Sequence, residues 1–392
     1  MEQNVNNMRL SSSEYVLDPT LQYLIFEGHR WTYTDLALIR HQVSLEKEGI
    51  RKAFWEFLRD WFSDGPTMEV QSSGSTGQPK RYAVDKEQMM NSACRTCRAL
   101  GLKTGDRILL CMDLRYIGAK MMIVRALVAG LEVVLQEPSA HPLARLEQSV
   151  DFLSVVPLQL FHSLQIPEER RRLEQIRLVL VGGGSVDKKL WQAVRNLSCR
   201  VYSSYGMTET LSHVALCDLQ DEAQIQIGKG DDFHLLYTPL PGVGVRQSED
   251  GCLMLDVPDV CAGTLETNDL VELRSDGSFI VLGRKDNVVN SGGVKIHLEE
   301  DEAVLSRILV DQCFALTAVA DPALGEALVL LIVAPQQETE NLIGVLKQCL
   351  PRYHVPRYIF PVSEIPVAGS GKIARATCRA LAEQELKKHR SA

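Results

Sequence analysis

The sequence predicts an α/β protein with a large N-terminal domain of βαβ layers, an antiparallel β subdomain within it, and a small α+β C-terminal domain. Strands alternate with helices from residue 68 to about residue 225, which indicates a mostly parallel sheet covered on both faces. Short strands broken by Pro and Gly follow, and beyond Gly283 helices and strands mix again. We therefore expect domains at residues 1–285 and 286–392.

The segment before the first alternating unit is expected to be helical over residues 30–62, with a start at Thr34. Phe54, Leu58 and Trp61 repeat at the spacing of a helix that buries one face.

The alternating region itself is predicted from apolar runs of strand length and longer amphipathic runs. Its expected strands are residues 68–71, 107–112, 132–135, 152–156, 176–181 and 200–202, and its expected helices are 85–100, 117–129, 167–175 and 187–196.

The later regions have a different pattern. Asp250-Gly251 and Asp276-Gly277 are turn signals between strand pairs, which favours antiparallel pairing. The expected strands there are 233–237, 243–247, 252–255, 270–274 and 279–281, followed by helix 298–309, strands 313–319 and 327–333, helix 337–349 and a tail helix from Ala374.

Composition limits the classes of function. The 392 residues are 45% hydrophobic and 23% charged, with a net charge of -8, which gives no overall attraction to nucleic acid or an anionic membrane. The longest apolar run, residues 121–131, contains Arg125 and is far shorter than the ~20 residues of a membrane span. A polar N-terminus and ten scattered cysteines predict a cytoplasmic protein without stable membrane insertion, and a homo-oligomer stays possible.

A loop rich in serine and glycine follows the predicted strand 68–71. Glycines let successive backbone N–H groups turn towards an anion, hydroxyls add donors, and a lysine adds positive charge. The spacing is not that of a Walker A loop, and a flexible connector is the alternative. The residues predicted to bind phosphate are Ser72, Ser73, Gly74, Ser75, Thr76, Gly77 and Lys80.

A second motif, Tyr205-Gly206-Met207-Thr208-Glu209-Thr210, follows a predicted buried strand. One interpretation is a helix start, with Thr208 as the N-cap and Glu209 in the first turn. The other is a magnesium site, because Mg²⁺ keeps several waters and needs few protein carboxylates when phosphate oxygens complete its shell.

These two motifs together resemble those of the adenylate-forming superfamily, which includes acyl- and aryl-CoA ligases, luciferase-type enzymes and peptide-synthetase adenylation domains. The resemblance implies that Tyr205 stacks on adenine and that Thr208 and Glu209 are catalytic, Thr208 through the α-phosphate and Glu209 through the metal that it holds. Gly182, Gly183 and Gly184, which a strand-to-helix turn would equally explain, resemble the segment that lines the adenine pocket. The residues of the motif assigned to ATP or AMP are Tyr205, Gly206, Met207 and Thr208.

The resemblance continues in order along the chain. Asp269 matches the ribose-binding aspartate, although Asn268 replaces the preceding glycine and is expected to keep its turn through a positive φ. Arg284 matches the second ribose contact, and Asp286 the hinge between domains. Lys372, in a Gly-Ser-Gly-Lys stretch, matches the catalytic lysine of a mobile C-terminal domain.

The resemblance also implies the reaction and its cofactors. A carboxylic acid is joined to AMP from ATP and Mg²⁺, pyrophosphate leaves, and the small domain then rotates so that coenzyme A attacks the acyl-adenylate. Preplaced positive charge would stabilise the charge that builds up between carboxylate and α-phosphate.

The chain is short for this superfamily and so resembles its compact 2-succinylbenzoate–CoA ligases of menaquinone synthesis. Their acid has two carboxylates, and Arg125 resembles the arginine that meets the carboxylate that is not activated; a helix-surface arginine is the alternative. Another acid–CoA ligase, an enzyme that loads a carrier protein, and an inactive nucleotide-binding homologue also stay open. The acid-binding residues are predicted to be Arg125, Thr210, Ser212 and His213, of which His213 could instead be structural.

Overall fold

The computed structural model describes residues 15–71, 81–227, 233–310, 312–335, 339, 342–367 and 373–391. The chain forms two compact units. Of the described residues, the first unit comprises 15–71, 81–244 (with the gap 228–232) and 256–264, and the second comprises 245–255 and those from 265 on. This division differs from the predicted boundary near Asp286, because the antiparallel strands that follow residue 244 cluster with the C-terminal part; the functional domain boundary stays a prediction.

The first unit is built on a sheet with a parallel centre. Its strand order is β12-β10-β9-β8-β7-β5-β6-β1-β2, and the central run from β9 to β1 is parallel throughout. The strands are β1 (Tyr23–Phe26), β2 (His29–Thr32), β5 (Arg107–Leu110), β6 (Glu132–Leu135), β7 (Phe152–Val155), β8 (Leu178–Val181), β9 (Arg200–Gly206), β10 (His213–Asp218), β11 (Ile225–Ile227), which pairs with β12, and β12 (Phe233–Pro239).

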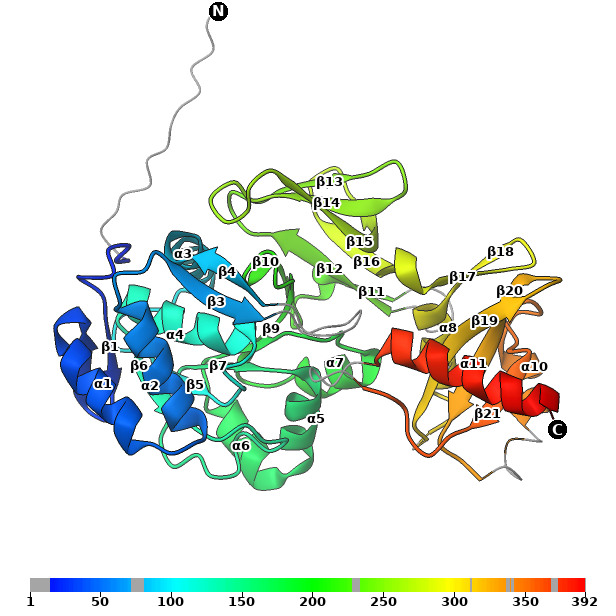
Figure 1. Ribbon diagram of the computed structural model, residues 1–392, viewed down its shortest axis with the longest axis horizontal. Coiled ribbons are helices and arrows are strands. Elements are labelled where there is room, and N and C mark those ends of the chain that lie inside the picture. Colours follow the sequence, from blue (N-terminus) through cyan, green and yellow to red (C-terminus); the bar gives the residue numbers. More distant parts are fainter. Residues whose placement is uncertain are drawn as a thin grey trace, which may run out of the picture. The chain divides into compact units, whose positions relative to one another are not determined.

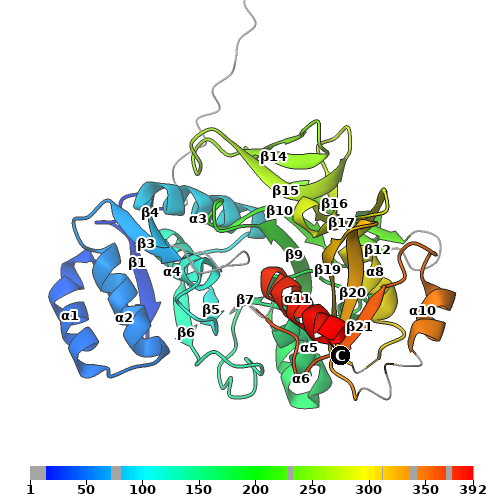
Figure 2. The same ribbon diagram turned by 45° about the vertical axis from the view of Figure 1, so that its right-hand side comes forward.

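Burial explains the parallel arrangement. Every residue of β7 and β8 is buried, as expected for strands covered on both faces. Helix α3 packs on α4, and α4 packs on β1 and β5 (Figures 1 and 2). The helices are α3 (Lys86–Leu100), α4 (Ile117–Ala129), α5 (Pro157–Gln165), α6 (Pro167–Glu174) and α7 (Lys188–Val194), with the short 3₁₀ turn η2 (Glu222–Gln224). The predicted fold class is confirmed.

The N-terminal segment was expected to be one helical region, and this prediction is wrong in part. Strands β1 and β2 form a hairpin, a 3₁₀ turn η1 (Tyr33–Asp35) follows, and two helices replace one: α1 (Leu36–Leu45) and α2 (Ile50–Trp61). The break contains Gly49 at φ 92°, a conformation that a side chain would strain. The helical spacing of apolar residues correctly predicts α2, whose Phe54 and Trp61 are fully buried. It does not mark the hairpin or the separate helix α1.

Two further elements differ from the sequence prediction. Helix α5 was missed, although Pro157 at its first position is a start signal. The alternative interpretation of Thr208 as a helix N-cap does not hold, because a turn leads from β9 directly into β10. The helix-cap interpretation of the second motif is therefore wrong.

The second unit contains two sets of paired strands. In the first, β13 (Gly244–Gln247), β14 (Cys252–Asp256), β15 (Thr264–Leu273) and β16 (Phe279–Arg284) lie in chain order, as the turn signals predict. Asn268 lies inside β15 in extended conformation, so the expected positive-φ turn is absent there.

The other sheet of the second unit has apolar residues on both faces. Along β20, Leu328, Leu330 and Ile332 pack with α8 and α10, while Val329 and Leu331 pack with α11. The elements are η3 (Lys285–Asn287), β17 (Val288–Ser291), β18 (Val294–His297), α8 (Leu298–Leu305), β19 (Phe314–Asp321), β20 (Gly325–Ile332), α10 (Leu342–Cys349), β21 (Tyr358–Pro361) and α11 (Arg375–Ser391), and the strand order is β18-β17-β20-β19 with β21 beside β20.

None of the helices in the described ranges is long and apolar enough to cross a bilayer.

The two-faced core of β20 leads to a stability prediction. Leu330→Ala removes a fully buried side chain and should lower the free energy of unfolding by about 2–5 kcal/mol. Val345→Ala on α10, where Val345 is 40% exposed, should change it by less than about 0.5 kcal/mol. Urea denaturation of both variants measures the difference, and equal effects would contradict this account of the core.

Candidate active site

The first group of predicted site residues lies at one edge of the parallel sheet. Strands β8 and β9 are parallel neighbours, with Val181 opposite Ser203. Gly182 directly follows β8, and Tyr205 lies at the end of β9, so the two segments emerge at the same carboxyl edge. Ligands of open α/β sheets bind at this edge. The half-buried Tyr205 ring lies 5.9 Å from the ring of Tyr237.

Glycine is required at one position of this edge. A Cβ on Gly206 would lie 2.5 Å from both His213 Cα and Ser212 O, because Gly206 pairs with His213 across β9 and β10. Backbone atoms cannot move aside as a flexible side chain can. A Cβ on Gly182 would lie 2.7 Å from the Ser204 hydroxyl oxygen, a side-chain atom that can rotate away, so the requirement for glycine is weaker there.

The turn after Gly206 holds Glu209 outward. Thr210 Oγ1 accepts from Met207 N at 3.0 Å and donates to Ser212 O at 2.7 Å, so its hydroxyl stabilises the turn. Within the described part of the chain, the exposed Glu209 carboxylate has no hydrogen-bond or ion-pair partner, and only its backbone oxygen accepts from Cys261 Sγ, at 3.1 Å. A free carboxylate of this kind suits a Mg²⁺ ion that takes its other ligands from phosphate and water.

Arg125 is buried, which contradicts the helix-surface interpretation. Its side chain is 2% exposed, and burial lowers the pKa of its guanidinium to about 10. Its Nη2 donates to Ser212 Oγ and its Nη1 lies 3.4 Å from Met122 Sδ, while its buried Nε has no hydrogen-bond partner. Among the residues that the structure describes, no carboxylate pairs with Arg125.

His213 lies beside this guanidinium with both ring nitrogens in contact. Its Nδ1 is 3.3 Å from Ser212 Oγ, and its Nε2 is 3.3 Å from Thr96 Oγ1 on α3. Burial, followed by the positive charges of Arg125 and Arg95, holds the pKa of His213 well below its usual value. The imidazole is therefore neutral, as a second cation beside Arg125 would be unfavourable.

Two predicted segments fall outside the described residues. These are the phosphate loop, with Ser72, Ser73, Gly74, Ser75, Thr76, Gly77 and Lys80, and the segment with Lys372.

The described residues on either side of each segment pair with each other as β-strand or β-bridge partners. Gln71 at the end of β3 (Thr67–Gln71) pairs with Arg81 at the start of β4 (Arg81–Asp85), and Val367 pairs with Ile373. Both pairings hold the two ends of their segment together, and both are antiparallel.

The second unit brings together the residues predicted to bind ribose and to form the hinge. Asp269 on β15 lies opposite Arg284 on β16, and Arg284 Nη1 is 3.3 Å from Asp269 Oδ1. Asp286 Oδ2 accepts from Arg284 Nη2 at 3.0 Å and from Asn268 Nδ2 at 3.1 Å. Thus Asn268, predicted to form a turn, instead contacts the predicted hinge residue.

Comparison with known proteins gives the family. Residues 70–251 match the family model described as AMP-binding enzyme. The chain is 27% identical over 353 residues to a 2-succinylbenzoate–CoA ligase of Bacillus cytotoxicus, covering 84% of this chain and 73% of that one. It is also 33% identical to an acyl-CoA synthetase (AMP-forming)/AMP-acid ligase II-like protein of Dyadobacter fermentans, covering 86% of this chain and 96% of that structure, with a TM-score of 0.55. The chain belongs to the AMP-binding enzyme family.

A further solved structure supports the fold of this AMP-binding enzyme. The O-succinylbenzoate coenzyme A synthetase of Bacillus subtilis, in complex with ATP and magnesium ion, has a TM-score of 0.68 at 20% identity, covering 92% of this chain and 97% of that one. The resemblance predicted from the motifs is thereby confirmed at the level of family and fold, while the roles of individual residues stay predictions.

Sequence reasoning missed three residues that the fold brings into contact with, or close to, the predicted site residues. Thr96 contacts His213, and Cys261 contacts Glu209 from a distant segment of the chain. Tyr82, on β4 directly after the predicted phosphate loop, has a buried hydroxyl with no hydrogen-bond partner among the described residues, and burial followed by the charge of Glu209 raises its pKa to about 12. No local pattern marks such residues, since each depends on the fold.

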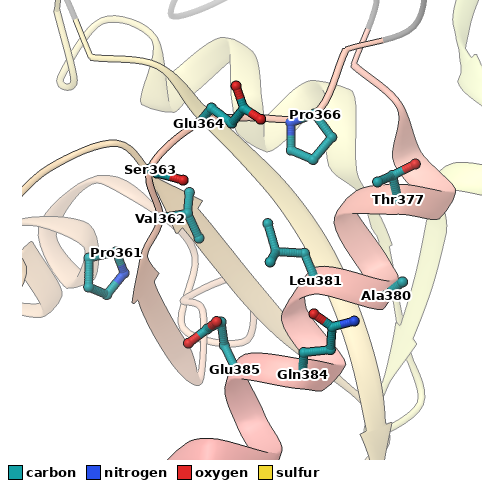
Figure 3. A pocket seen from close by; sticks show the side chains of 10 residues that line it. All are labelled: Pro361, Val362, Ser363, Glu364, Pro366, Thr377, Ala380, Leu381, Gln384 and Glu385. Atoms are coloured by element: carbon teal, nitrogen blue, oxygen red, sulfur yellow. The ribbon is translucent and has the colours of Figure 1, made fainter.

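A groove of about 390 Å³ lies in the second unit, but it contains none of the predicted site residues. Figure 3 shows Val362 and Leu381 on its walls, with Glu364 and Glu385 at its margins. These two carboxylates would repel an anionic nucleotide, so we do not assign the groove to the AMP-binding site.

The close approach at Gly206 leads to a prediction. Gly206→Ala should force β9 and β10 apart, and we expect at least a roughly 100-fold loss of acid-dependent pyrophosphate release, about 2.7 kcal/mol in the barrier. Gly118→Ala on α4 is the matched control, because a Cβ there meets nothing within 4 Å and alanine favours a helix. Similar activity of the two variants would show that the turn does not need a glycine at 206.

Proposed function

We propose that this protein is an AMP-forming acid–CoA ligase that activates 2-succinylbenzoate, using ATP, Mg²⁺ and coenzyme A. Family membership supports the adenylating reaction. The choice of substrate is supported by relatives named 2-succinylbenzoate–CoA ligase, such as the proteins of Bacillus cytotoxicus and Listeria monocytogenes. The Listeria protein is 26% identical over 339 residues, and the match covers 82% of this chain and 71% of that one.

The buried guanidinium of Arg125 is the observation that carries the choice of acid. A buried charge is costly unless an opposite charge or hydrogen bonds compensate it. Arg125 has only Ser212 and a methionine sulfur as hydrogen-bond partners among the described residues, and its Nε has none. A substrate with a second carboxylate, bound but not activated, would supply the missing partner.

The activated carboxylate would react at the other end of the site. Mg²⁺ bound by Glu209 would neutralise phosphate charge, and Lys372 would stabilise the charge that develops as the carboxylate attacks the α-phosphate. The free Glu209 carboxylate and the turn that presents it support this role. Thr208, beside Glu209 in this turn, is proposed to contact the α-phosphate.

The remaining residues would hold the nucleotide. Tyr205 and the backbone of Gly182–Gly184 lie at the same edge of the sheet, which supports adenine binding there. Asp269 and Arg284, 3.3 Å apart, would bind the ribose hydroxyls. Asp286 is proposed as the hinge about which the C-terminal domain, from residue 286 on, rotates between the two half-reactions.

Two other functions stay as alternatives. A different aryl or acyl acid, or a carrier-protein thiol in place of coenzyme A, would leave the adenylation chemistry unchanged. A catalytically inactive nucleotide-binding homologue is less favoured, because both Glu209 and Lys372 are present. We also propose a cytoplasmic location, since the substrates are small soluble molecules.

Replacement of the buried arginine tests the substrate. Arg125→Leu should lower kcat/KM for 2-succinylbenzoate by about 100-fold, because a lost charge-assisted contact costs about 3 kcal/mol. The activity with 4-oxo-4-phenylbutanoate, which lacks the ring carboxylate, should change by less than about threefold. Arg115→Leu, at an exposed arginine paired with Asp113, is the control. Equal losses with both acids would remove Arg125 from substrate recognition.

Replacement of the predicted catalytic lysine tests the mechanism. Lys372→Ala should abolish acid-dependent pyrophosphate release, because the charge that develops during adenylation loses its stabilisation. Thioester formation from preformed acyl-adenylate and coenzyme A should stay within about threefold of wild type, because the developing charge of that step lies elsewhere. Parallel loss of both half-reactions would contradict the assignment of Lys372.

A further inference from the structure

A chain of hydrogen bonds links Arg125 to the core of helix α3. Arg125 Nη2 contacts Ser212 Oγ, Ser212 Oγ contacts His213 Nδ1, and His213 Nε2 contacts Thr96 Oγ1. Thr96 Oγ1 in turn donates to the backbone oxygen of Ser92 at 3.2 Å. Arg125 lies on α4, Thr96 on α3 and His213 on β10, so the chain joins three elements of the first unit, which lie side by side in Figures 1 and 2.

The hydrogen positions along this chain follow from its two ends. The guanidinium can only donate, so Ser212 Oγ accepts from Arg125. The single hydroxyl hydrogen of Thr96 goes to Ser92 O, so Thr96 accepts from His213 Nε2–H. The neutral imidazole then has a bare Nδ1, which accepts the hydrogen of Ser212. In this arrangement each of the four contacts from Arg125 Nη2 to Ser92 O has one donor and one acceptor, and Arg125 Nε stays outside the hydrogen-bonded chain.

We propose that Thr96 and His213 are positioning residues, which fix Ser212 and through it the Arg125 guanidinium, and so determine the selectivity for an acid with a second carboxylate. This inference rests on the proposed function and assigns His213 an indirect role in place of the acid contact that its sequence position predicts. Arg125 lacks a carboxylate partner in the described residues, so Ser212 is its main anchor.

The physical reason is the freedom of a long side chain. An arginine held at a single Nη atom keeps rotamer freedom that substrate binding must then remove. The tautomer of His213 orients the Ser212 hydroxyl so that its lone pair faces Arg125. Thr96, fully buried in α3, sets that tautomer. Loss of the Thr96 hydroxyl should therefore weaken binding of the second carboxylate without changing the chemistry at the first.

The test uses two substitutions at Thr96, one that removes the hydroxyl group and one that keeps it. Thr96→Val keeps the volume and removes the hydroxyl, whereas Thr96→Ser keeps the hydroxyl and removes a methyl group. We expect Thr96→Val to raise KM for 2-succinylbenzoate by about 10-fold with little change in kcat. A tenfold change is about what the loss of one hydrogen bond causes in a binding equilibrium. KM for 4-oxo-4-phenylbutanoate should stay unchanged, and Thr96→Ser should behave as wild type. His213→Phe breaks the same chain at a second point and should give the same pattern.

The outcomes separate this inference from the proposed function. If Arg125→Leu removes the preference for the diacid and Thr96→Val does not, the positioning role is overturned while the function stands. If Thr96→Val raises KM for both acids equally, or Thr96→Ser is as damaging, the residues have only a structural role and the inference is wrong. If Arg125→Leu leaves the preference for the diacid intact, the proposed substrate is contradicted, and the positioning role that rests on it is contradicted as well. Thermal unfolding of each variant confirms that the comparison is between folded proteins.

Discussion

A buried guanidinium with no carboxylate partner among the described residues is the constraint around which the proposed acid-binding end of this site is organised. Arg125 lies on a helix whose other inward positions are apolar, so it carries a charge where the fold supplies little compensation. The molecule tolerates this cost because Ser212, His213 and Thr96 form a polar path into α3. A buried polar chain is favourable only when each member is satisfied. Among the described members of this chain the unsatisfied atom is Arg125 Nε, which is where we propose that the second carboxylate of the substrate binds.

The turn between β9 and β10 connects the proposed acid-binding residues to the proposed nucleotide-binding residues. Glu209 and Ser212 lie in the same turn, three residues apart, so the proposed metal ligand and the anchor of Arg125 share one piece of backbone. The backbone of Ser212 and His213 lies so near Gly206 that no Cβ fits there, which defines where the turn begins, and the Thr210 hydroxyl stabilises its shape. Coupling of the two ends through one rigid turn suits a reaction that joins an acid to a nucleotide, because both must be placed within bonding distance.

The sequence predicted the elements that periodicity and motif order control, and it failed where tertiary contacts decide. Helix α4 has the predicted bounds, and the buried strands β7 and β8 lie close to theirs, because apolar runs of those lengths leave few alternatives. The break at Gly49 and the extended Asn268 were not predictable, since each depends on a local conformation that neighbours impose. In the site, the motif residues could be identified from the sequence, but Thr96 and Cys261 could not, because nothing local marks a residue that acts through a distant partner. The burial of Arg125 was an open question in the sequence, and packing of α4 against α3 and the sheet settled it.

The most direct test of the central claim is the acid dependence of pyrophosphate release by the wild-type protein with ATP and Mg²⁺. The account predicts release with 2-succinylbenzoate and a kcat/KM at least about 100-fold lower with 4-oxo-4-phenylbutanoate, which corresponds to about 2.7 kcal/mol of discrimination by the second carboxylate. A preference for the monocarboxylate, or equal turnover of both, would contradict the role of the buried guanidinium. No turnover of any acid, with ATP still bound, would show that the fold has lost its chemistry.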